Sequence, residues 1–88
     1  MLEGRLIKFT DLQNSDKNSW KSEYVNKRGW IIIRQSHHLY VGKQWVSFYT
    51  FEGKQLHTSV GVVEIDGNFL TITTKNSIYI FKIEKEVI

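Results

Sequence analysis

The chain has 88 residues, a net charge of +3, 41% hydrophobic residues and no cysteine. This length leaves room for one hydrophobic core, so we expect a single β domain over residues 1–88. The lack of cysteine excludes disulfides, thiolate catalysis and thiolate-bound zinc. No apolar run approaches the roughly 20 residues of a membrane span, and the first residues lack a signal-peptide pattern. The sequence therefore predicts a cytoplasmic protein with no membrane partner.

The first third of the chain predicts one strand and then a long polar connection. Residues 5–9 read Arg-Leu-Ile-Lys-Phe, whereas residues 10–27 are rich in Asp, Asn and Ser, which favour turns. Ser19 can cap a single helical turn that places Trp20 and Tyr24 on one side. Connections of this length in a small domain are often functional.

The middle of the chain predicts three strands. Residues 30–34 form a β-branched run that is too short for a helix, and residues 35–43 interrupt it. Residues 44–51 predict a strong strand. The sequence Glu-Gly-Lys at 52–54 then predicts a hairpin into residues 55–57.

The last third predicts a meander of three strands. Residues 59–65 and 69–74 are apolar runs joined by Asp66-Gly67, a pair typical of a type I′ hairpin turn in which both central residues have positive φ. A second tight turn at Lys75-Asn76 leads into residues 77–83. This last run is apolar on both of its faces, so either both faces are covered within the fold or one meets a partner or a second copy of the chain. A homodimer is therefore one alternative.

These elements predict an all-β fold with about six short antiparallel strands. We expect a strongly bent sheet or a small barrel of SH3-like or OB-like size, with a long N-terminal loop that can hold one helical turn. The sequence shows no repeat, linker or low-complexity segment that would suggest a second unit.

The sequence offers no organised set of catalytic or metal-binding residues. His37 and His38 are neighbours, whose side chains point to opposite sides in an extended chain, and His57 has no ligand partner at a fixed spacing. Ser, His and Asp are all present, but no nucleophile elbow, phosphate-binding glycine loop or paired-carboxylate motif arranges them. We therefore expect no enzymatic activity, no metal and no cofactor.

Aromatic and basic residues are interleaved between residues 20 and 45. This combination suits base stacking with phosphate neutralisation, and it also suits the energetic centre of a protein interface. We expect Trp30 and Trp45 to fill the core, and Trp20, Tyr24 and Tyr40 to lie on the surface because they fall in loop-like stretches. The predicted partner-binding residues are Trp20, Tyr24, Lys27, Arg28, Arg34, His37, His38 and Tyr40.

A short pattern in the last thirty residues resembles a known group. Thr58-Ser59 precedes a strand containing Val62-Val63, and Thr-Lys-Asn-Ser-Ile-Tyr follows at residues 74–79. This pattern resembles small phage and prophage proteins of Gram-positive bacteria, in which Thr-x-Asn-Ser-x-Tyr lies in a closing hairpin. The resemblance implies a phage-borne accessory protein, a group that includes inhibitors of host defence such as anti-CRISPR proteins. It assigns no functional residue, and the positive net charge differs from that of acidic inhibitors that mimic nucleic acids.

We therefore expect a non-enzymatic binding protein, a phage-type inhibitor that blocks a host macromolecule such as a CRISPR or other defence nuclease in the host cytoplasm. A host protein is the favoured partner. The first alternative is a small nucleic-acid-binding β-barrel that uses the same aromatic and basic residues. The second is a structural phage protein that self-associates through its apolar terminal strands.

Overall fold

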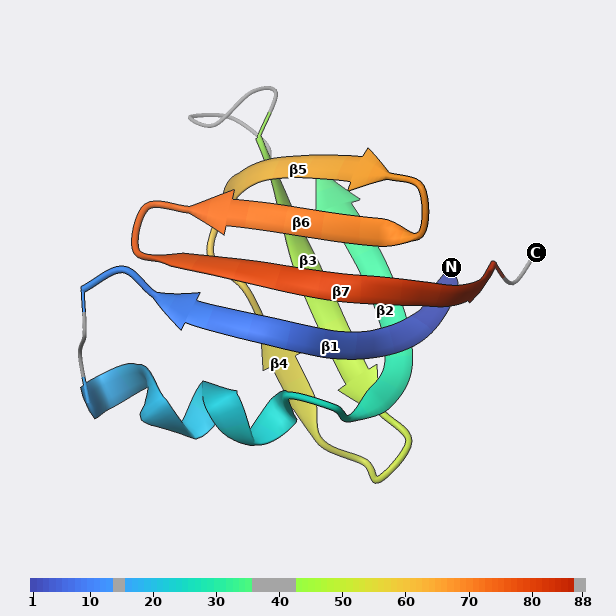
Figure 1. Ribbon diagram of the computed structural model, residues 1–88, viewed down its shortest axis with the longest axis horizontal. Coiled ribbons are helices and arrows are strands. Elements are labelled where there is room, and N and C mark those ends of the chain that lie inside the picture. The colour runs from blue at the N-terminus through green and yellow to red at the C-terminus, as the bar shows by residue number, and fades with distance from the viewer. Residues whose placement is uncertain (14–15, 36–42, 87–88) are drawn as a thin grey trace.

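The computed structural model describes residues 1–13, 16–35 and 43–86, and it describes the backbone alone for residues 16–19. These residues form strands and one 3-10 helix, with no α-helix among them. No helix in these ranges has the length and apolar character needed to cross a membrane. In chain order the elements are β1 (Leu2–Asp11), η1 (Asp16–Tyr24), β2 (Arg28–Gln35), β3 (Gln44–Thr50), β4 (Gln55–His57), β5 (Gly61–Asp66), β6 (Phe69–Thr74) and β7 (Ser77–Glu86) (Figure 1).

Six of these strands close into an antiparallel barrel, and β4 is added at one edge. The order around the barrel is β2-β1-β7-β6-β5-β3, and β3 pairs with β2 to close the ring. The junction between β3 and β5 is narrow, because within the described residues these strands pair only at Gln44 and Gly61. Further along the same edge of β3, β4 pairs with Ser47–Tyr49. The prediction of a small all-β barrel is confirmed.

The barrel consists of two layers that cross. Figure 1 shows β5, β6, β7 and β1 side by side in front, with β2, β3 and β4 running across behind them. β1 belongs to both layers, because it pairs with β7 along most of its length and with β2 through Leu2–Arg5. Sheets that cross at a large angle leave a compact space between their inner faces, and side chains fill it.

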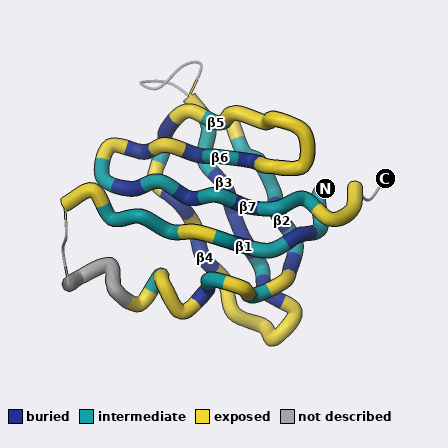
Figure 2. The backbone as a smooth tube through the Cα atoms, in the orientation of Figure 1, coloured by how far each residue is buried: buried dark blue, intermediate teal, exposed yellow. Residues whose placement is uncertain are grey.

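The inward-facing side chains of both layers form one core. Phe48 on β3 and Phe81 on β7 meet edge to face, with ring centroids 5.2 Å apart. Burial alternates along the strands, as expected for strands with one face covered (Figure 2). The buried hydrophobic residues are Leu6, Tyr24, Ile31, Val46, Phe48, Leu56, Leu70, Ile72, Tyr79 and Phe81.

The 3-10 helix η1 packs across one end of the barrel. Tyr24 at its end is only 8% exposed, and its Oη donates a hydrogen bond to the carbonyl oxygen of Gln55 at 2.9 Å. Lys21 Nζ donates to Tyr79 Oη at 3.0 Å. The rings of Trp20 and Tyr24 meet edge to face at 5.9 Å, which agrees with the prediction that they share one side. The helix is longer than the predicted single turn, because it begins at Asp16, and Ser19 therefore lies inside it rather than at its cap. The polar helix η1 is therefore bound to the barrel through hydrogen bonds of two tyrosine side chains.

The hairpin between β5 and β6 differs from its prediction by one residue. Asp66 pairs with Phe69, so the two turn residues are Gly67 and Asn68 rather than Asp66 and Gly67. Gly67 has φ of +59°, and Asn26 is the one non-glycine residue with positive φ in the described chain, so Asn68 has negative φ. Positive φ at the first central residue alone is the pattern of a type II′ turn, not of the predicted type I′.

The first and last strands are longer than predicted. β1 continues to Asp11, which pairs with Ser77, and β7 continues to Glu86, which pairs with Leu2. In a sequence pattern, polar residues indicate the end of a strand. In the folded chain they remain in the strand when a neighbouring strand supplies hydrogen bonds. The long connection predicted from residue 10 therefore begins at residue 12.

Candidate functional site

The outer face of β2 and β3 carries large side chains that do not reach the core. Because Ile31, Val46 and Phe48 point inward, their neighbours along each strand point outward. The strand register places Trp30 opposite Tyr49, Ile32 opposite Ser47 and Arg34 opposite Trp45. On β4, His57 lies opposite Ser47. We use the term aromatic–arginine face for Trp30, Arg34, Trp45, Ser47, Tyr49, Phe51 and His57.

Arg34 is held in place at the centre of this face. Its Nε donates to Ser47 Oγ at 2.9 Å, and its Nη2 donates to Tyr49 Oη at 3.3 Å. Its Cζ lies 5.4 Å from the centroid of the Trp45 ring, within the range of a cation–π interaction. A guanidinium has five N–H donors, and the other three have no hydrogen-bond partner among the described residues. Arg34 is therefore oriented by its neighbours and still able to bind an acceptor.

Ser47 connects the two halves of the face. Its side chain is fully buried, and its Oγ lies 2.9 Å from His57 Nδ1. Because Oγ accepts from Arg34, its hydroxyl hydrogen is available for an unprotonated Nδ1, and we assign the histidine tautomer on that basis. The His57 ring also lies 5.9 Å from the Trp45 ring and 5.7 Å from the Tyr49 ring. Although a serine beside a histidine resembles a nucleophile and its base, this oxygen is covered, so we interpret Ser47 as a positioning residue.

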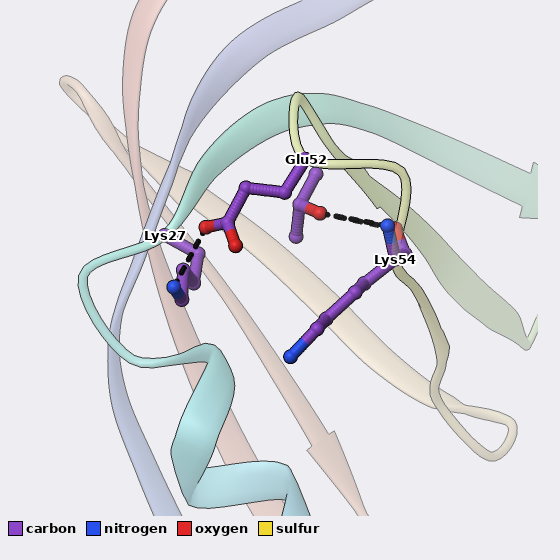
Figure 3. Close-up of polar contacts among 4 residues, drawn as sticks. Lys27, Glu52 and Lys54 are labelled. Carbon is purple, nitrogen blue, oxygen red and sulfur yellow. Dashed lines mark hydrogen bonds and ion pairs between the residues drawn. The ribbon is translucent and has the colours of Figure 1, made fainter.

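Aromatic side chains extend the face toward the β3–β4 hairpin. Trp30 and Phe51 meet edge to face with centroids 5.4 Å apart, and Phe51 is 53% exposed. Beside them, the Nζ of Lys27 lies 2.6 Å from an oxygen of Glu52, as Figure 3 shows. The hydrogen bond from Lys27 lowers the pKa of Glu52, and the charges of Lys27 and Lys54 act in the same direction. An ion pair therefore borders the aromatic end of the face.

The predicted binding residues are spread over several parts of the molecule. Arg34 lies on the aromatic–arginine face, and Lys27 lies at its border. Arg28 forms a two-point ion pair with Glu84, at 3.2 and 3.0 Å. Trp20 is 46% exposed, as expected, but it lies on η1.

Three expectations about aromatic side chains need correction. Tyr24 is buried against the barrel rather than on the surface, because its hydroxyl has a backbone partner on β4. Trp30 and Trp45 are half-buried on the outer face and do not belong to the core. Both tryptophans occupy strand positions whose side chains point outward, and Phe48 and Phe81 fill the space inside the barrel. His37, His38 and Tyr40 lie outside the described residues.

The prediction missed Tyr49, Phe51 and His57 as surface residues. One pattern in the sequence could have identified two of them. Positions 45, 47, 49 and 51 alternate with Val46 and Phe48. A strand with one solvent-exposed face would therefore place Trp, Ser, Tyr and Phe together on that face. His57 could not be found in this way, because its place beside Ser47 depends on the register of β4.

No group of three or more His, Asp or Glu side chains that could hold a metal ion occurs within residues 1–13, 16–35 and 43–86. Among known proteins, no family model, curated sequence or solved structure matches this chain.

Proposed function

We propose that this chain is a non-enzymatic binding protein that docks a partner protein on its aromatic–arginine face. The observation that supports this proposal best is the placement of Arg34, which is bonded to Ser47 and Tyr49 and lies beside Trp45. Trp, Tyr and Arg are the residues that carry most of the binding energy in protein interfaces. An arginine that is oriented before binding loses less side-chain freedom on complex formation.

The chemistry of the face indicates what it would bind. The three unbonded N–H groups of Arg34 suit a carboxylate or a row of backbone carbonyls, and they suit a carboxylate best because that contact can be bidentate. The rings of Trp45, Tyr49 and His57 offer apolar area with polar tips. The preferred partner surface therefore has an acidic side chain surrounded by apolar groups.

The distribution of cations favours a protein over a nucleic acid. Among the described side chains, Arg34 is the one cation on the face, whereas Lys27 and Arg28 are paired with Glu52 and Glu84. A groove that follows a phosphate backbone needs several cations in a row. Stacking of bases on Trp45 and Trp30 is still chemically suitable, so a nucleic-acid-binding barrel is the second candidate.

The kind of partner is proposed from the sequence resemblance alone. The pattern shared with small phage proteins supports an inhibitor that blocks a host macromolecule, such as a CRISPR or other defence nuclease. In that role the protein would work by occlusion, because a rigid barrel wall covers a site on its target without a chemical step.

The test is quantitative capture from a nuclease-treated lysate of a Gram-positive bacterium. The double variant Arg34→Ala/Trp45→Ala should lose at least about 90% of a captured protein, because interface centres lose 2 kcal/mol or more on truncation. The matched control is Leu12→Ala, which removes an exposed apolar side chain just beyond the end of β1 and should leave capture unchanged. Equal capture by the double variant, with a melting curve showing that it is folded, would contradict the proposal.

A salt titration separates the second candidate from the first. Binding of a fluorescent single-stranded oligonucleotide through phosphates should weaken linearly in log–log form as salt increases. We expect no measurable affinity at low salt. Affinity that disappears in the Arg34→Ala/Trp45→Ala variant would instead support the nucleic-acid-binding barrel.

A further inference from the structure

Within the described residues, most of one edge of β5 has no hydrogen-bonded neighbour. β5 pairs with β6 along its whole length, from Gly61 to Asp66. On its other edge it meets β3 at Gly61 alone, so within the described residues Val62–Asp66 have no strand beside them. Figure 1 shows β5 as the outermost strand of the front layer. An unpaired edge presents a row of backbone donors and acceptors to an incoming strand.

The side chains beside this edge are exposed and apolar. Val62 is 46% exposed and Ile65 is 55% exposed, although they point to opposite faces of the strand. Figure 2 shows that the exposed surface continues through the hairpin after β5. Natural proteins usually protect such edges with lysine, proline or a bulge, and Val62–Asp66 contain neither lysine nor proline.

The outer face of β5 also carries two negative charges. Glu64 pairs with Thr71 and Asp66 pairs with Phe69, and both carboxylates lie on the outside because Leu70 and Ile72 point inward. Neither carboxylate forms an ion pair with a described cation. Together with Thr71, Phe69, Ile7 and Ile80 they line an open hollow that combines apolar side chains with two carboxylates. The aliphatic stem and charged end of a lysine or arginine match such a hollow.

We propose that the β5 edge binds an extended segment of another polypeptide, which adds as a strand and places basic side chains opposite Glu64 and Asp66. Backbone hydrogen bonds to Val62–Asp66 would supply affinity independent of sequence. Specificity would come from alternate side chains, because those on the outer face lie beside Glu64 and Asp66 of β5. This surface lies on the layer opposite the aromatic–arginine face, and the inference does not rest on the function proposed for that face.

A second copy of the chain fits this edge poorly. The antiparallel register that pairs all of Val62–Asp66 with itself places Glu64 opposite Glu64 and Val62 opposite Asp66. Like charges directly opposite one another destabilise a strand pair. A basic segment makes the same backbone hydrogen bonds and replaces this repulsion with attraction, so charge complementarity favours it.

The test is an amide chemical-shift titration of the full chain with a defined peptide. The probe is acetyl-Thr-Lys-Val-Lys-Val-Lys-Thr-amide, and its charge-reversed control has glutamate in place of each lysine. We expect the lysine peptide to shift the amides of Val62–Asp66 and to protect those that point away from β6, and the glutamate peptide to bind at least about tenfold more weakly. A lysine peptide in which every backbone amide is N-methylated keeps its charge but has no N–H to donate to the edge, and it should not bind.

The double variant Glu64→Lys/Asp66→Lys completes the test, since both positions are exposed and the barrel should fold unchanged. It should reverse the preference between the two peptides. Shifts confined to β2–β4, equal binding of the N-methylated peptide, or unchanged preference in the double variant would each overturn the proposal. So would light scattering that shows a dimer, together with protection of the outward-pointing amides of Val62–Asp66 in the absence of peptide, because the occupant would then be a second copy.

Discussion

The two outer faces of the barrel show how differently one fold can present its surface. On β2–β4, Arg34, Ser47 and His57 are joined by hydrogen bonds and surrounded by aromatic rings. On the layer formed by β5, β6, β7 and β1, the exposed positions carry Val62, Phe69 and the carboxylates of Glu64 and Asp66, which form no ion pair with a described cation. The first face is held by hydrogen bonds among its own side chains, whereas on the second, within the described residues, Val62–Asp66 have no strand beside them. This difference is the basis for proposing selective side-chain contacts on one layer and strand addition on the other.

The largest expected effect comes from the core that supports both faces. Phe48→Ala removes the ring that meets Phe81 between the two layers, and it should lower the free energy of unfolding by about 3–5 kcal/mol. Chemical denaturation measures this loss, and the exposed Phe69→Ala serves as the matched aromatic control with a far smaller effect. Similar losses in the two variants would mean that the layers do not share one core.

The next effect distinguishes the hydrogen-bonded face from the other one. Ser47→Ala leaves Arg34 Nε and His57 Nδ1 without their common partner, so we expect a loss of about 1–3 kcal/mol. Its counterpart on the opposite layer, Thr71→Ala, should change stability by about 0.5 kcal/mol or less. Equal denaturation midpoints for Ser47→Ala and Thr71→Ala would contradict the expected stabilisation by the hydrogen bonds of Ser47.

The smallest effect concerns the border of the aromatic–arginine face. Lys27→Met removes the hydrogen bond that lowers the pKa of Glu52, so this pKa should rise toward its ordinary value of 4.5. Lys54→Met should raise it less, because Lys54 acts through its charge alone. Side-chain carboxyl NMR over an acid titration measures both shifts. A larger shift in Lys54→Met than in Lys27→Met would show that the ion pair of Figure 3 does not dominate.

The sign of the accompanying pH effect follows from the direction of this shift. Glu52 has a lower pKa in the folded state than in the unfolded state. Its interaction with Lys27 therefore stabilises the fold at pH values above the unfolded-state pKa. This stabilisation is lost as the pH falls through the folded-state pKa. Because Glu52 is exposed, this contribution is small and should weaken further with added salt.

The strand pattern of this chain was predictable in most places. Alternating and β-branched runs located each of the strands within a few residues, and Trp20 with Tyr24 located the helical segment. Errors occurred where neighbouring strands decide the outcome. Asp11 and Glu86 extend their strands because β7 and β1 pair there, and the β5–β6 turn moved to Gly67 because the register joins Asp66 with Phe69.

The candidate surface was much less predictable. Clustering of aromatic and basic residues along the chain led to the selection of Tyr24, Arg28 and Lys27. In the structure Tyr24 is buried, and Arg28 and Lys27 each form an ion pair. Residues that are neighbours in sequence alternate between faces of a strand. Residues that share a face come from different strands, as Arg34, Trp45 and His57 do.

The sequence by itself determined that this chain folds as one small all-β domain without cysteine chemistry, because length, composition and the period of hydrophobic residues are local properties. Only the tertiary structure decided how the barrel closes, which tryptophans face outward, and that Val62–Asp66 have no strand beside them within the described residues. These outcomes depend on register between strands far apart in the chain. A shift of one residue would move a whole set of side chains to the opposite face.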